Sequence, residues 1–231
     1  MSIGKKKTYS KKYNKKALSA SAKASKALYL VKRSIRNEEV KYKNGATFTT
    51  LITQSLQIVH LTTVASGDEA EGRDGNKINL MGIKLMLHLN NTPASNINTG
   101  CIVRVLIIQD SQQQADTAPN AAELLNITGL AYNALYQYPQ VAHRFRILAD
   151  RYINLNPTGA YGLTTPAFQS TALHAHRVYN IRPKFKHIYY NGANATDIQK
   201  NGVYFCICKS SSDASNTLTP ELNWQLKYTD A

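Results

Sequence analysis

The most regular pattern along the chain is an alternation of apolar and polar residues between positions 77 and 91. Every second residue from Ile83 to Leu89 is apolar, so these side chains share one face of an extended chain. Ile78 and Leu80 have the opposite parity, and the slip between the two sets falls at Gly82. A β-bulge adds one residue to a strand and produces such a slip. We therefore predict a strand over 77–91 with a bulge at Gly82.

Seven other segments have the composition or the alternation of β-strands. They are 47–64, 101–110, 143–155, 173–182, 184–190, 202–209 and 222–229. The segment 101–110 is nearly all apolar apart from Arg104, as expected for a strand that is covered on both faces. Pro183 separates 173–182 from 184–190 because proline cannot donate a hydrogen bond in a central ladder. Between the strands, Asn120 is placed to cap a short helix over 121–125.

Eight extended segments joined by long polar loops predict an all-β domain, either a β-sandwich or a jelly roll. A chain of 231 residues is long enough for one well-buried domain. No repeat of roughly 20–50 residues is evident, which argues against a propeller or a solenoid. The strand pattern begins after Asn44-Gly45. We therefore assign 45–231 to the domain and 1–44 to an N-terminal arm.

The charges of the chain are concentrated in the arm. Residues 1–36 carry 12 of the 28 Lys and Arg and none of the 14 Asp and Glu. The rest of the chain has 16 Lys and Arg against 14 Asp and Glu, a net charge of +2. A strongly basic segment on a nearly neutral body predicts that the arm holds a polyanion, because lysines neutralise phosphates and bind any base sequence with a salt-dependent affinity. The alternative is a solvated tail that aids solubility.

The candidate nucleic-acid-binding residues are the twelve cations of residues 1–36. They are Lys5, Lys6, Lys7, Lys11, Lys12, Lys15, Lys16, Lys23, Lys26, Lys32, Arg33 and Arg36.

The arm has two parts of different character. Residues 2–16 lack apolar periodicity, so we expect them to be disordered until they meet a partner, with Tyr9 and Tyr13 either stacking on unpaired bases or touching nothing. Residues 17–36 have apolar positions three and four apart and cations on the other side, which predicts a basic amphipathic helix. This helix either packs against the domain with its cations on phosphate or lies on a membrane surface, and the absence of Trp and Phe favours the first.

The lysine clusters of the arm are also suited to a nuclear import signal. The acid-free start has a weaker likeness to a mitochondrial transit peptide, although such peptides favour Arg over Lys. The chain has no run of 18 apolar residues, so we expect no membrane-spanning helix.

Pairs of cations or histidines two residues apart share a strand face in the predicted body. Arg144 with Arg146, and Lys184 with Lys186, either line a surface that meets nucleic acid or form a solvated side. His174 and His176 are able to bind a metal together, and such a pair also occurs in rolling-circle nucleases. Those enzymes need a tyrosine followed three or four residues later by a lysine, which this segment lacks. A polar strand face is the simpler interpretation.

The remaining candidate chemistry is weak. Cys206 and Cys208 lack a second Cys or His pair for zinc, so we expect them and Cys101 to be reduced thiols. The acidic segment 66–76, with four carboxylates, either gathers a calcium ion at a symmetry axis or is a solvated loop. The motifs GxxxxGK[ST], GxSxG and HExxH are absent. We therefore expect a protein that is not an enzyme and that needs no cofactor or metal.

Several stretches resemble the capsid proteins of small circular single-stranded DNA viruses that encode their own replication initiator, the CRESS-DNA viruses. The stretches are Gly75-Asn76-Lys77-Ile78 leading to Gly82-Ile83-Lys84-Leu85, then Val103 to Asp110 followed by Gln112-Gln113, and Asn201 to Phe205. Their order, with the Lys-rich arm first, carries more weight than any one stretch, and the likeness spans about 1–229. Ten of the twelve arm charges are Lys, whereas circovirus arms are commonly Arg-rich.

The resemblance implies a single eight-stranded jelly roll, built from two antiparallel four-stranded sheets, with a basic and partly helical arm. It also implies a virion protein: about sixty copies form an icosahedral shell whose arms package single-stranded DNA, after assembly in the host nucleus. The satellite tobacco necrosis virus coat protein has a similar plan, which leaves an RNA genome open. The alternatives are a nucleic-acid-binding protein that forms no shell, and a carbohydrate-binding jelly roll.

Overall fold

The computed structural model describes residues 23–28, 39–48, 51–93, 101–113, 117–127, 130–137, 143–155, 173–210 and 216–231. The chain divides into two units, Met1–Glu39 and Val40–Ala231. In the first unit, residues 23–28 form a helix within the predicted range 17–36. The second unit begins with a strand at Val40, earlier than the Asn44-Gly45 boundary expected from the sequence.

The second unit contains two main antiparallel sheets, as an all-β prediction requires. The six-stranded sheet has the order β1-β12-β3-β9-β10, and β8 pairs with β3. Its strands are β1 (Val40–Phe48), β3 (Lys77–Pro93), β8 (Leu173–Ile181), β9 (His187–Tyr190), β10 (Ile198–Lys200) and β12 (Asn216–Asp230). The four-stranded sheet has the order β2-β11-β4-β7. Its strands are β2 (Gln57–His60), β4 (Cys101–Asp110), β7 (Phe145–Leu155) and β11 (Gly202–Lys209).

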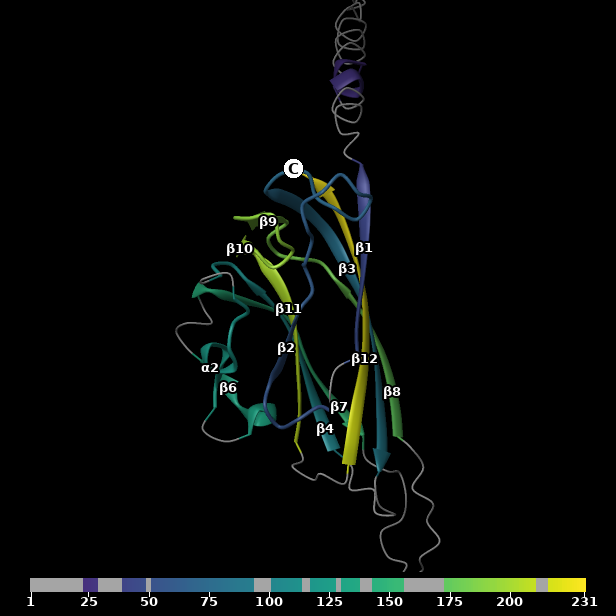
Figure 1. Cartoon of the computed structure of the whole chain (residues 1–231), viewed down its shortest axis with the longest axis vertical. Helices are drawn as coiled ribbons and strands as arrows, with labels where there is room; N and C mark the ends of the chain where they lie inside the picture. The colour runs from purple at the N-terminus through teal and green to yellow at the C-terminus, as the bar shows by residue number, and fades with distance from the viewer. Residues whose placement is uncertain are drawn as a thin grey trace, which may run out of the picture. The chain divides into compact units, whose positions relative to one another are not determined.

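The two sheets pack against each other and enclose the main apolar core (Figure 1). Leu85 and Leu222 enter this core from the six-stranded sheet, and Val105 and Phe205 enter it from the four-stranded sheet. Each of these strands sends alternate side chains inward, which is how a sheet buries one face. The arrangement is compatible with a jelly roll.

The predicted bulge in β3 is confirmed. Lys227 of β12 pairs with Gly82 and the next residue, Tyr228, pairs with Leu80, so Met81 is the extra residue of β3. Ile78 and Leu80 before the bulge are fully buried, and so are the leucines of opposite parity after it. The extra residue therefore lets both sets of apolar side chains face the same core.

A third layer covers the outer face of the four-stranded sheet. It is made by α2 (Ala121–Leu124), β5 (Leu125–Asn126), the 3-10 helix η1 (Ala131–Asn133) and β6 (Leu135–Tyr136). Figure 1 shows α2 and β6 on the far side of this sheet from β12 and β3. Asn120 caps α2 as predicted, because its side chain accepts a hydrogen bond from the Glu123 backbone N–H while the Glu123 carboxylate accepts one from the Asn120 N–H.

The third layer bears on the apolar residues that occupy both faces of 202–209. Contacts between copies of the chain would be one explanation for them. The structure explains them within one chain: Phe205 and Ile207 face the main core, while Cys206 and Cys208 pack in a second apolar cluster with Leu124 and Leu125 of the third layer. All residues of β11 are buried in this way. The prediction that 101–110 is covered on both faces is confirmed for the same reason.

Several predicted strand boundaries are wrong. The segment 47–64 is not one strand. Residues 47 and 48 end β1 in the six-stranded sheet, and residues 57–60 form β2 in the four-stranded sheet. Lys184 and Lys186 precede β9, whose hydrogen-bonded ladder begins only at His187. β12 begins at Asn216 instead of Leu222, since its first residues pair with the end of β3. β7 begins at Phe145, two residues after the predicted start.

We predict that Leu87→Ala lowers the free energy of unfolding by about 2–5 kcal/mol, because it leaves a cavity in the main core. Met86→Ala is the matched control, since Met86 is adjacent in β3, faces outward and is 40% exposed. The control should change the stability by about 0.5 kcal/mol or less. Urea denaturation measures both. Similar losses in the two variants would contradict the assigned faces of β3.

Candidate functional site

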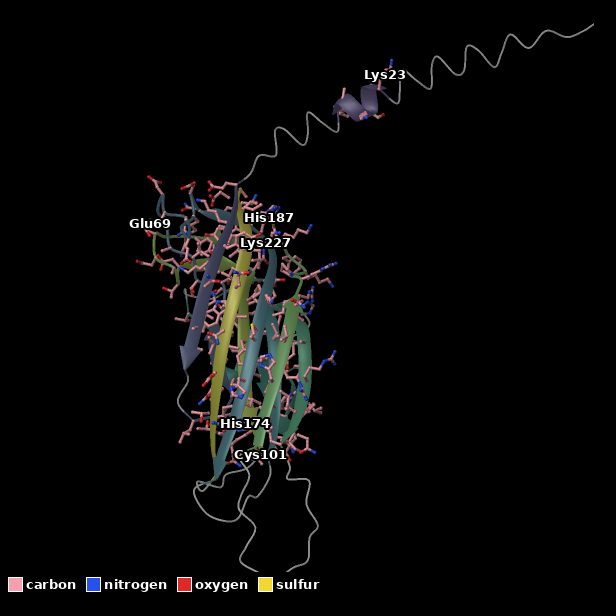
Figure 2. All side chains as sticks on the ribbon, turned by 90° about the vertical axis from the view of Figure 1, so that its right-hand side faces the viewer. Lys23, Glu69, Cys101, His174, His187 and Lys227 are labelled. Carbon is pink, nitrogen blue, oxygen red and sulfur yellow. The ribbon has the colours of Figure 1, made fainter. Side chains whose placement is uncertain are left out.

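Most of the residues that are predicted to bind nucleic acid lie outside the described part of the chain. Of the twelve arm cations, the structure describes Lys23 and Lys26, both exposed on the helix 23–28 (Figure 2). Lys5, Lys6, Lys7, Lys11, Lys12, Lys15, Lys16, Lys32, Arg33 and Arg36 lie outside the described residues, as do Tyr9 and Tyr13. The candidate site that can be built from contacts is therefore in the second unit.

Two buried cations of the body, Arg104 and Lys41, are held by carboxylates of the same chain. Arg104 donates from Nε and Nη2 to Asp150, and its Nη1 donates to the carbonyl of Ala134 at 2.7 Å. Burial alone would raise the pKa of Asp150, but hydrogen bonds from Arg104 and Tyr136 outweigh it and hold the pKa below its usual value. Lys41 similarly contacts Asp230 at 2.8 Å and Asp74 at 3.3 Å. These cations stabilise the fold and are not available to a ligand.

Arg144 corrects the prediction made for the pair Arg144 and Arg146. It lies just before β7, its guanidinium contacts the fully buried Asp110 at 2.7 Å, and a second nitrogen contacts Glu123 at 3.2 Å. Arg144 therefore neither forms a solvated strand face nor faces a polyanion; it links β4 to α2 of the third layer. Lys184 and Lys186 are exposed, as a solvated or ligand-facing side requires, but they do not lie on a strand.

The outer face of the six-stranded sheet has no third layer among the described residues, and it carries three grooves in a row. The first, the basic groove, has a volume of about 240 Å³ and is lined by Tyr42, Lys84, Arg182 and Lys227 among others. Tyr42 and Lys227 are directly paired across β1 and β12, and the Lys227 ammonium lies 5.7 Å from the centre of the Tyr42 ring. No carboxylate is among the described residues that line this groove.

The second groove, the amide groove, adjoins the first and shares Lys84 and Gln225 with it. It has a volume of about 490 Å³ and includes Asn44 and Asn223. The Gln225 side chain donates a hydrogen bond to Asn44 Oδ1 at 3.0 Å, and Gln225 is paired with Lys84 across β12 and β3. Amide side chains both donate and accept hydrogen bonds, so this groove is able to bind hydroxyl groups, phosphate oxygens or bases.

The third groove, the histidine groove, shares Met86 and Asn223 with the amide groove. His88 and His176 are opposite each other on β3 and β8, and His88 Nδ1 lies 3.6 Å from Glu221 Oε2. The His174 ring stacks on His88 with centroids 5.6 Å apart. His174 and His176 thus share the exposed face that their spacing predicted. Among the described residues, no group of three or more His, Cys, Asp or Glu is arranged to hold a metal ion.

We call the three grooves together the outer trough. It runs along β12 and β3 from Lys227 to Glu221, six residues or about 20 Å at the rise of a strand. Figure 2 looks onto this face, with Lys227 toward one end of the sheet and His174 toward the other. The cations lie at one end and Glu221 at the other, so an anionic ligand would be favoured at the basic groove.

Sequence reasoning missed the outer trough because its residues come from four strands. The alternation in 77–91 places Lys84, Met86 and His88 on the polar side of one strand. It does not reveal that β8 and β12 flank this strand and bring Arg182, His176 and Lys227 beside it. Tyr42 and Asn44 were assigned to the arm, although they belong to β1.

The other candidate groups of the sequence have structural explanations. Cys101, Cys206 and Cys208 are free and buried, and burial raises the pKa of Cys208 to about 12 and raises that of Cys206 as well. In the acidic segment, Asp74 contacts Lys41, while Asp68, Glu69 and Glu71 are exposed. The four carboxylates therefore do not share one cation-binding position in this chain.

A scan of the sequence against protein-family models finds no matching family, and a search of curated proteins finds no match. The resemblance to CRESS-DNA virus capsid proteins therefore stands as a proposal. Within the part of the chain that the structure describes, no helix is long and apolar enough to cross a membrane.

We predict that Arg144→Ala lowers the free energy of unfolding by about 3–5 kcal/mol, because it leaves the buried Asp110 carboxylate without its partner. Lys184→Ala removes a cation that is exposed, so it should change stability by about 0.5 kcal/mol or less. Chemical denaturation at neutral pH compares the two. A loss for Arg144→Ala as small as that of the control would show that this ion pair is not a structural link.

Proposed function

We propose that this chain is a virus capsid protein of the CRESS-DNA type. In this proposal a jelly-roll shell domain assembles into a small icosahedral particle of about sixty copies. The Lys-rich arm packages single-stranded DNA by neutralising its phosphates. The protein acts in the virion as a structural component and not as an enzyme, and it assembles in the host nucleus.

The strand order is the observation that carries the proposal. Eight strands are divided equally between the two sheets: β1, β3, β8 and β12 lie in one in the order β1-β12-β3-β8, and β2, β4, β7 and β11 lie in the other in the order β2-β11-β4-β7. Along the chain these eight change sheet at every step except from β4 to β7. Two Greek keys wound into two four-stranded sheets give this order in a jelly roll, a fold common in viral shells. The short strands β5, β6, β9 and β10 then belong to the connections between the eight.

The separation of charge supports nucleic-acid packaging by the arm. The ion pairs that hold Arg104, Arg144 and Lys41 use cations of the body for folding. Residues 1–36 of the arm have twelve cations and no carboxylates, so nothing within this stretch offsets its charge. Sixty such arms would supply about 720 positive charges, enough to neutralise a substantial part of a genome of roughly one to two thousand nucleotides.

An exposed apolar patch supports self-association. Leu135 of β6 is 79% exposed, the largest value among the large apolar side chains that the structure describes, and Ile127 and Leu130 nearby in the chain are 40% and 38% exposed. Leu135 is paired with Asn126, the residue before Ile127. Apolar side chains gathered at the surface favour a protein interface. We include this patch among the contacts between copies.

The sequence leaves open two other functions in place of a shell-forming protein. A nucleic-acid-binding protein that forms no particle would share the arm. A carbohydrate-binding jelly roll is favoured by one specific observation, the amide groove, because Asn and Gln side chains recognise hydroxyl groups. In that case the ligand would bind without the arm.

The assembly test uses the full chain, expressed, treated with nuclease and examined by sedimentation and electron microscopy. We expect uniform spheres about 20 nm across that retain nuclease-protected single-stranded nucleic acid. Replacing Lys5, Lys6, Lys7, Lys11, Lys12, Lys15 and Lys16 by Gln should greatly lower the nucleic-acid content, read from the ratio of absorbance at 260 and 280 nm. A 25.7 kDa monomer at every ionic strength would contradict the proposed shell. Unchanged nucleic-acid content would contradict the role of the arm.

We predict that Leu135→Lys reduces particle formation while leaving the domain folded, because the exposed side chain contributes little to the core. Leu135→Met is the control and should assemble like the wild-type protein, since it keeps an apolar side chain of similar volume. Sedimentation velocity measures the assembled fraction, and circular dichroism checks the fold. Full assembly of Leu135→Lys would exclude this patch from the contacts between copies.

A further inference from the structure

We propose that the basic groove is a second binding site for the single-stranded nucleic acid that the arm holds, and that it contacts the phosphate backbone through Lys84, Arg182 and Lys227. This inference rests on the proposed packaging function and adds a folded site to it. The sequence places nearly all the net positive charge in the arm, so a site on the nearly neutral body is not expected from composition.

The first argument is the charge of the groove. Among the described residues, no carboxylate forms an ion pair with Lys84, Arg182 or Lys227. Arg104 and Arg144, in contrast, are neutralised by Asp150 and Asp110. Three cations without an acidic partner in one groove of a body whose net charge is near zero form a local site for an anion.

The second argument is the geometry of the face. Lys84 projects from the middle of the sheet, where Gln225 and Asn180 are paired with it on either side. These amides line the same groove and are able to bond phosphate oxygens or bases. The groove is open and continues into the amide groove, so a chain can pass through it. An extended polyanion fits this shape better than a small enclosed ligand.

The third argument is Tyr42, which lines the groove with 45% of its surface exposed. An exposed aromatic ring beside cations is the arrangement by which proteins bind unpaired bases without reading their sequence. Tyr42 therefore adds a surface for base stacking beside the three cations of the groove.

The test measures binding of oligo-dT to the full-length protein by fluorescence anisotropy over a series of salt concentrations. The variant Lys84→Gln/Arg182→Gln/Lys227→Gln removes the three cations. For single strands the slope of log K against log salt changes by about 0.7 per phosphate contact, so the slope should become shallower by about 2. The matched control, Arg151→Gln/Arg177→Gln/Lys200→Gln, removes the same charge from exposed positions outside the groove and should leave the slope unchanged.

A second pair of variants tests the role of the Tyr42 ring. Tyr42→Leu should weaken oligo-dT binding about 5- to 150-fold, the loss of one base stacked on an aromatic ring. Tyr42→Phe keeps the ring and should bind as the wild-type protein does. Equal weakening by the two Tyr42 variants, or equal slope changes in the two triple variants, would overturn the proposal.

The outcomes separate this site from the proposed function. If the protein forms no particles and the arm variant keeps its nucleic acid, the capsid proposal fails. The comparison of salt slopes then still tests whether the groove binds oligo-dT. If particles form and lose nucleic acid only in the arm variant, the groove proposal fails alone. If the groove variant loses binding to heparin but keeps its slope for oligo-dT, the site serves a sulfated polysaccharide and the nucleic-acid assignment is wrong.

Discussion

The pairing of β3 with β12 is the interaction on which the rest of the body depends. All 15 residues of β12 pair with β3, and β1, β8 and β9 attach to one or the other of these two, while β10 joins the sheet through β9. β1 adds to the free side of β12, and β8 and β9 add to β3. Because the two strands are far apart in the sequence, closing this long loop costs entropy before the ladder is formed. The six-stranded sheet therefore cannot be completed until β12 has paired with β3.

Strands with a strong local pattern could be predicted, and strands that depend on distant partners could not. The alternation around Gly82 reveals β3 with its bulge, and the apolar runs reveal β4 and β11. β1 was missed because Asn44-Gly45 has the sequence of a turn. In the structure Gly45 lies within a strand, and a Cβ atom there would clash with the indole ring of Trp224. Glycine is needed for a close contact that only the folded sheet creates.

The candidate sites differ in the same way. The basic arm is visible by counting charges, because residues 1–36 contain twelve cations and no carboxylate. The outer trough depends on register, since a shift of one residue would turn Lys84 and Lys227 into the core. Arg144 shows the reverse error: its spacing from Arg146 suggested a surface pair, but the fold places it on Asp110. Sequence spacing identifies which residues share a strand face, and the partner strands decide what that face does.

The third layer also has a chemical consequence for the three thiols. Cys206 and Cys208 lie beneath this layer, Cys101 lies in the main core, and burial raises the pKa of each. Since the thiolate is the reactive form, these cysteines resist oxidation and crosslinking between copies as long as the layer stays closed. A thiol-specific label would react with Cys206 or Cys208 only when the layer opens. The rate at which the label reacts would therefore measure the opening of the third layer in the wild-type protein, with no cysteine introduced for the purpose.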